Sequence, residues 1–158
     1  MILQDKEQTI RLSVTDYESG KPTGEYDDPF DEWLNLEVEI TKKGQSSSLH
    51  ECKGAMQIGE LSYFIAWPHK IEEGKINPAL APERHFSFLE PDICFEYRES
   101  PEKQLGIQFD WNLSDNENFL FTTLDTQNFK REVEVFSREV KPYLDWAEVQ
   151  SKKPAAKL

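Results

Sequence analysis

Three residue types that bind metals stand side by side in the sequence, as His50, Glu51 and Cys52. On an extended strand His50 and Cys52 would share a face, where they could bind zinc. A zinc site needs two further ligands, and no C-x-x-C or H-x-x-x-H motif accompanies these residues. We therefore interpret the segment as an ordinary strand with a buried cysteine, and we predict no metal site.

The other sequence patterns that support catalysis are absent. The chain has no phosphate-binding glycine loop, no G-x-S-x-G and no H-E-x-x-H. Residues 27–32 group several carboxylates, but they lack the alternating oxygen ligands and the central glycine of a calcium loop. We predict that the protein is not an enzyme and needs no cofactor.

Carboxylates are concentrated between residues 16 and 39. This stretch has nine acidic residues and one basic residue, Lys21, and so holds two-thirds of the net charge of −12. Its glycines and prolines predict a long loop, and four aromatic residues lie within the same stretch. Acidic groups accelerate encounter with a basic partner, and aromatic rings supply contact area. We expect the partner to contact Tyr26, Asp27, Asp28, Phe30, Asp31 and Glu32.

Two alternatives to a binding loop stay open. The loop could be solvated, with its aromatic rings folded back onto the core. The polar face of the predicted sheet is a rival partner surface, because a second acidic stretch, residues 90–117, overlaps it. The acidic residues expected on that face are Glu37, Glu39, Glu96 and Asp110.

Length and composition limit the classes of protein. The 158 residues predict one domain, which we place at residues 1–150, followed by a flexible basic tail at 151–158. The net charge of −12 argues against binding nucleic acid or an anionic membrane surface, since both attract positive charge. Two cysteines, no signal peptide and no apolar run of about 18 residues predict a cytoplasmic protein.

Alternating apolar and polar residues predict an antiparallel sheet. In residues 34–41 every second residue is apolar, which is typical of a strand with one buried face. Residues 43–45 and 100–103 have the composition and length of hairpin turns. The same alternation predicts further strands around residues 10–14, 47–53, 85–89, 92–99, 105–112 and 119–124.

Two segments have helical periodicity. The first is residues 57–67, and we expect Pro68 to end it because the residue before a proline is pushed out of helical geometry. The second is residues 129–144, and we expect Pro142 to kink or end it. The chain is therefore predicted to be α+β, with a single twisted antiparallel sheet of about six or seven strands and two helices on one face.

Residues 86–97, with the sequence FSFLEPDICFEY, resemble the F-x-E-P-D/N-L-x-F core of the bacterial immunity proteins called WapI-type. Other features follow in that family's order, namely a Trp33-Leu34 strand opening, a helix with Leu61 and Phe64, a G-I-x-F-D strand at 106–110 and a long C-terminal helix. The resemblance covers residues 33–146. Shortly after the G-I-x-F-D strand, where that family often has proline and aromatic residues, this chain has the polar and acidic segment 112–118. Partner-contacting residues are not a fixed motif in such families, so none is carried over.

The resemblance implies a cytoplasmic immunity protein that protects bacteria from a polymorphic or contact-dependent toxin. Such toxins are often nucleases, whose basic residues face phosphate, so an acidic inhibitor suits them. The expected partner is therefore a basic cognate toxin domain, with no nucleic acid or membrane involved. The alternative function is that of an acidic secretion chaperone or adaptor, which would bind an unfolded effector segment.

Overall fold

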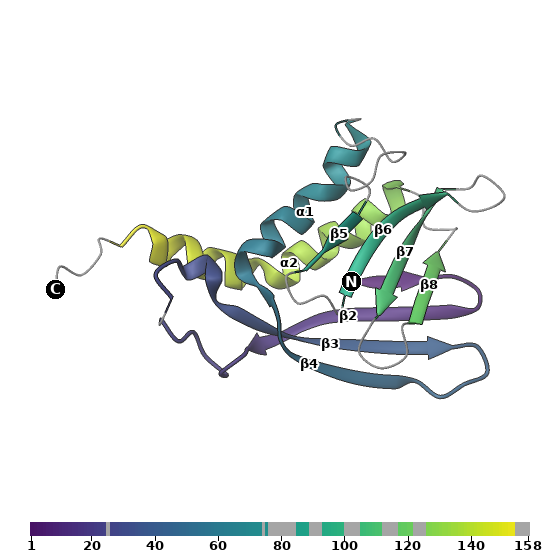
Figure 1. Ribbon diagram of the computed structural model, residues 1–158, viewed down its shortest axis with the longest axis horizontal. Coiled ribbons are helices and arrows are strands. Elements are labelled where there is room, and N and C mark those ends of the chain that lie inside the picture. The colour runs from purple at the N-terminus through teal and green to yellow at the C-terminus, as the bar shows by residue number, and fades with distance from the viewer. Residues whose placement is uncertain are drawn as a thin grey trace.

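The computed structural model describes residues 1–24, 26–73, 75, 85–88, 93–99, 105–111, 117–121 and 126–153 (Figure 1). Its elements form two antiparallel sheets and two long helices. An α+β fold with antiparallel strands is therefore confirmed. The tail predicted at residues 151–158 lies mostly outside the described residues, and the division into domain and tail stays a prediction.

The first sheet consists of β1 (Ile2–Gln4), β2 (Gln8–Tyr17), β3 (Trp33–Lys42) and β4 (Ser48–Gln57), in that order. Its strands alternate between buried and partly exposed residues. In β3 the side chains of Leu34, Leu36, Val38 and Ile40 are at most 4% exposed, and the residues between them are partly exposed. The predicted turn joins β3 to β4. There Gln45 N–H donates to the Lys42 carbonyl at 2.9 Å, and Gly44 has a φ of 75°, which favours glycine.

The second sheet consists of β5 (His85–Ser87), β6 (Ile93–Glu99), β7 (Leu105–Trp111) and β8 (Glu117–Phe121), also in chain order. The prediction of one sheet is therefore wrong. Alternation identifies the buried face of a strand but not the strand beside it, and a helix separates β4 from β5 in the chain. The hairpin pairing of β6 with β7 is confirmed, while residues 100–103 lie outside the described residues.

The helices are α1 (Ile58–Glu72) and α2 (Thr126–Ser151), and both continue through the prolines expected to end them. Pro68 lies between Trp67 and Ile71, which are 4% and 8% exposed. Burying side chains of this size gains roughly 1.5–3 kcal/mol each. That gain offsets the roughly 3 kcal/mol that an internal proline costs a helix. Packing on the core therefore decides the length of α1, and local propensity does not.

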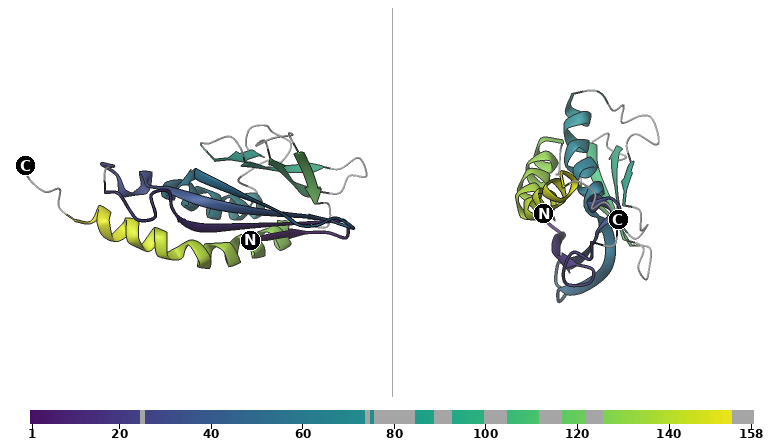
Figure 2. Two further views of the ribbon diagram at one scale, coloured as in Figure 1. Left: turned by 90° about the horizontal axis from the view of Figure 1, so that it is seen from below. Right: turned by 90° about the vertical axis from the view of Figure 1, so that its left-hand side faces the viewer.

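Aromatic rings join the two helices to the second sheet. Phe64 of α1 is fully buried at the centre of this cluster. Its ring centroid lies 4.9 to 6.4 Å from those of Phe86, Phe88, Phe95, Phe129 and Phe136. The apolar residues of the first sheet belong to the same core. In Figure 2 helix α2 runs lengthwise beside the first sheet, which it contacts at β1 and β2, and the second sheet forms a separate layer.

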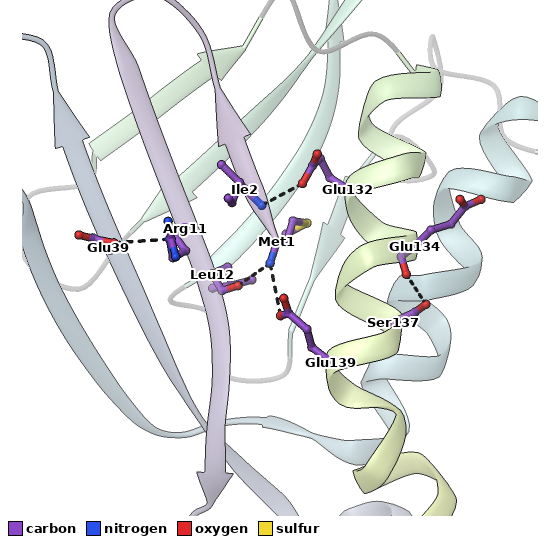
Figure 3. Close-up of polar contacts among 9 residues, drawn as sticks. All are labelled: Met1, Ile2, Arg11, Leu12, Glu39, Glu132, Glu134, Ser137 and Glu139. Carbon is purple, nitrogen blue, oxygen red and sulfur yellow. Dashed lines mark hydrogen bonds and ion pairs between the residues drawn. The ribbon is translucent and has the colours of Figure 1, made fainter.

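One hydrogen bond and one ion pair join the start of the first sheet to helix α2 (Figure 3). The Met1 ammonium donates to the Leu12 carbonyl at 2.8 Å and lies 3.6 Å from the Glu139 carboxylate. Ile2 N–H donates to Glu132 Oε2 at 3.2 Å. Burial lowers the pKa of the Met1 ammonium, while Glu139 acts in the opposite direction. These contacts tie the first sheet to the helix layer at its β1 edge.

Replacing Phe64 with alanine should lower the free energy of unfolding by about 3–5 kcal/mol, because it empties the centre of the aromatic cluster. Its neighbour Tyr63 is 68% exposed, and Tyr63→Ala should change that free energy by less than about 0.5 kcal/mol. Urea unfolding followed by circular dichroism measures both. Equal losses in the two variants would contradict the central position of Phe64.

Candidate functional site

The loop between β2 and β3 carries most of the predicted partner-binding residues, and Glu32 anchors it. Glu32 is only 2% exposed. Its carboxylate accepts hydrogen bonds from Gly24 N–H at 2.7 Å and from Thr23 Oγ at 3.0 Å. Its carbonyl accepts from Ile58 N–H, the first residue of α1, at 3.0 Å. We had expected Glu32 to face a partner, but its buried carboxylate holds the loop instead.

The other predicted partner-binding residues lie on the surface or at its edge. Asp27, Asp28 and Asp31 are exposed, and Tyr26 is 40% exposed. Phe30 is partly buried and packs on the core. The Phe30 ring is thus folded back onto the core, while Tyr26 and the three aspartates face solvent.

A short 3-10 helix, η1 (Pro29–Asp31), fixes the orientation of these acids. Asp28 caps it, accepting a hydrogen bond from Phe30 N–H at 3.0 Å. Asp31 N–H closes the turn onto the Asp28 carbonyl at 3.0 Å. A side chain on Gly59 would come within 3.4 Å of the Phe30 carbonyl, so η1 packs directly on the first turn of α1.

A groove of about 480 Å³ lies where η1, the start of α1 and β5 meet. Its lining contains carboxylates and aromatic rings but, among the described residues, no basic side chain. The lining residues are Asp28, Phe30, Asp31, Gln57, Gly59, Glu60, Tyr63, Phe86 and Ser87. The structure therefore brings part of the acidic loop together with residues more than twenty-five positions further along the chain.

Sequence reasoning missed Glu60, Tyr63 and Phe86 as members of this site. A signal existed for Tyr63, because it falls off the buried apolar stripe of α1 and is 68% exposed. Glu60 is explained locally by a capping box, in which its carboxylate accepts from Gln57 N–H at 2.7 Å. Nothing local marks Phe86, since its position depends on how β5 packs beside α1.

A second aromatic group holds the base of the loop. The Tyr17 ring, at the end of β2, lies 5.1 Å from Tyr143 and 5.7 Å from Trp146 of α2, edge to face in both pairs. Burial, followed by the neighbouring Tyr143, Glu32 and Asp16, raises the pKa of Tyr17 to about 12. The acidic loop is therefore attached to helix α2 as well as to α1.

The prediction that the rival acidic residues share one face of a sheet is wrong. Glu37 and Glu39 belong to β3 in the first sheet, whereas Glu96 and Asp110 belong to β6 and β7 in the second. The Asp110 side chain lies outside the described residues. Glu39 is partly neutralised, since it lies 3.6 Å from Arg11 (Figure 3).

His50 and Cys52, which the sequence analysis considered as metal ligands, both lie in strand β4. His50 Nε2 lies 3.2 Å from Ser48 Oγ, and Cys52 and Cys94 are both buried thiols. Within the described ranges, no three metal-binding side chains are grouped to hold an ion, and no helix has both the length and the apolarity to cross a membrane. The E-P-D segment at residues 90–92 lies outside the described residues.

Comparison with known families identifies the class of protein. The sequence model of the WapI-like immunity protein family matches residues 1–144, which is most of the chain. The chain belongs to this family of immunity proteins. The match confirms the resemblance inferred from residues 86–97 and extends it to the first strands. Searches of curated proteins and of solved structures found no match.

Removing the Glu32 carboxylate should loosen the loop. Glu32→Ala deletes the acceptor of two hydrogen bonds, and we expect the free energy of unfolding to fall by roughly 1.5–3 kcal/mol. The exposed neighbour Asp31 provides the control, since Asp31→Ala should cost less than about 0.5 kcal/mol. Urea unfolding measures both values. A loss in Glu32→Ala no larger than that in Asp31→Ala would show that the buried carboxylate does not hold the loop.

Tyr17 should make stability fall at alkaline pH. Its folded-state pKa is about 12, above the ordinary value of about 10, so the folded protein keeps a proton that the unfolded chain loses. The contribution is fully present below pH about 10 and is lost as the pH rises toward 12. Denaturant unfolding across this range should show a smaller fall for Tyr17→Phe. An identical fall in the wild type and Tyr17→Phe would contradict the assignment.

Proposed function

We propose that this protein binds a cognate bacterial toxin domain in the cytoplasm and neutralises it without any chemical step of its own. Membership of the immunity protein family supports the toxin as partner. The observation that carries the proposed binding site is the groove, where exposed acids of the loop adjoin an exposed aromatic ring of α1. The acids can attract a basic partner, and the aromatic ring beside them offers apolar contact area.

The partner we propose is a basic toxin domain. The chain carries a net charge of −12, which raises the rate of encounter with a positively charged surface. A nuclease has such a surface, because its substrate presents a row of phosphates. An inhibitor that covers this surface blocks substrate by occupying its place, and needs neither a cofactor nor a catalytic group.

Effective neutralisation requires tight binding over an area larger than the groove. Nanomolar affinity corresponds to about −12 kcal/mol. Interfaces of that strength commonly bury roughly 1,200–2,000 Å². The groove supplies the centre of such an area, and the exposed residues Tyr26 and Asp27 extend it along the loop. Tyrosine is among the residues that carry most of the binding energy at protein interfaces.

The surface of the acidic loop suits a basic partner better than the polar face of the first sheet does. On that face Glu39 pairs with Arg11 and accepts a hydrogen bond from Ser47 Oγ at 2.7 Å, so its charge is partly satisfied within the protein. Asp27 and Asp31 belong to a stretch with one basic residue in 24. Their charge is therefore not offset by basic neighbours in the chain, and it stays available to a partner.

Reversing two exposed loop acids tests this choice of surface. Asp27→Lys with Asp31→Lys spares the buried Glu32 and the Asp28 cap, so the fold should be retained. We expect the association rate constant with the cognate toxin domain to fall about tenfold at low salt, with a weaker dependence on salt. Stopped-flow fluorescence at several ionic strengths measures it.

The matched control is Glu51→Lys on the face of the first sheet, where the residue is exposed. It should change the rate constant much less than the loop variant. A larger effect from Glu51→Lys would move the interface to the first sheet. Failure of the wild-type protein to form any complex with the toxin domain, or to protect cells expressing it, would overturn the proposed function.

A further inference from the structure

We propose that the groove between η1, α1 and β5 accepts an arginine side chain of the toxin. This inference rests on the proposed function and specifies the chemistry of the contact. The groove measures about 480 Å³. Pockets that enclose small ligands measure roughly 300–1,000 Å³, so one long side chain with its flanking backbone can enter.

The charge of the lining requires a cation. Asp28, Asp31 and Glu60 contribute three carboxylates, and the described lining residues include no lysine, arginine or histidine. Asp28 and Glu60 each also accept a hydrogen bond from a backbone N–H, which carries no net charge and so leaves the negative charge of the carboxylate in place. The start of α1 opposes this charge, but a helix N-terminus carries only about half a positive elementary charge. The carboxylates therefore dominate, and the local field favours a positively charged group.

The rings of the lining select arginine rather than lysine. Phe30, Tyr63 and Phe86 line the same groove, and Tyr63 is 68% exposed. A planar guanidinium can stack on such a ring while its N–H groups bond to carboxylates at its edge. An ammonium is a compact, strongly hydrated charge that gains less from this combination. The neighbouring acids and rings thus match both parts of an arginine side chain.

A titration with a small probe tests the groove without the toxin. The full-length protein, labelled with ¹⁵N, is titrated with N-acetyl-arginine methylamide and with the uncharged citrulline analogue. We expect the arginine probe to bind at least fivefold more tightly and to shift the amide signals of Gly59, Glu60, Tyr63 and Ser87. Equal binding of the two probes, or shifts confined to other elements, would overturn the proposal.

Variants of the exposed ring separate stacking from charge. Tyr63→Ala should weaken binding of the arginine probe at least threefold, whereas Tyr63→Phe should retain it, because the ring remains. Asp31→Asn should also weaken binding of the arginine probe. Glu51→Gln, which lies outside the groove, should leave that binding unchanged. Unchanged binding in Tyr63→Ala would remove the ring from the site and overturn the arginine assignment.

The outcomes also separate this inference from the proposed function. If the toxin domain is bound and neutralised but the probe shows no preference for arginine, the arginine assignment alone fails. If no complex forms with the toxin domain, the proposed function fails, and the probe titration still reports whether the groove binds arginine.

Discussion

A buried carboxylate must be hydrogen-bonded, and in this protein that requirement ties the acidic loop to the helices. Glu32 satisfies it with Gly24 and Thr23, while its own carbonyl accepts from the first residue of α1. The loop is therefore held at both of its sides, and η1 rests on the first turn of α1. This anchor helps to hold the exposed acids in a fixed position relative to Tyr63, beside the groove.

Local pattern was enough to predict most strands and both helices, because a half-buried strand or helix records its buried face in its sequence. It could not predict the division into two sheets, which depends on which strand edges meet. It also misjudged Pro68 and Pro142, whose local cost is outweighed by the burial of neighbours such as Trp67. The two errors share a cause, since tertiary packing overrides local preference at these positions.

The site was predictable only in part. The concentration of acids in residues 16–39 is visible in the sequence, and part of it lies in the loop that borders the groove. Glu32 is acidic like its exposed neighbours Asp27, Asp28 and Asp31, so nothing in the pattern indicated that it is buried. Phe86 enters the groove through the packing of β5 on α1, a contact between segments far apart in the chain. Composition can thus indicate the charge of a binding surface, but not its shape.

The central claim is that the partner occupies the groove and the adjoining loop. Hydrogen–deuterium exchange on the complex with the cognate toxin domain tests it most directly. The account predicts slower exchange on binding in residues 26–31 and 57–63, with little change in β3 and β4. Protection confined to β3 and β4, with the loop and the start of α1 unchanged, would contradict it.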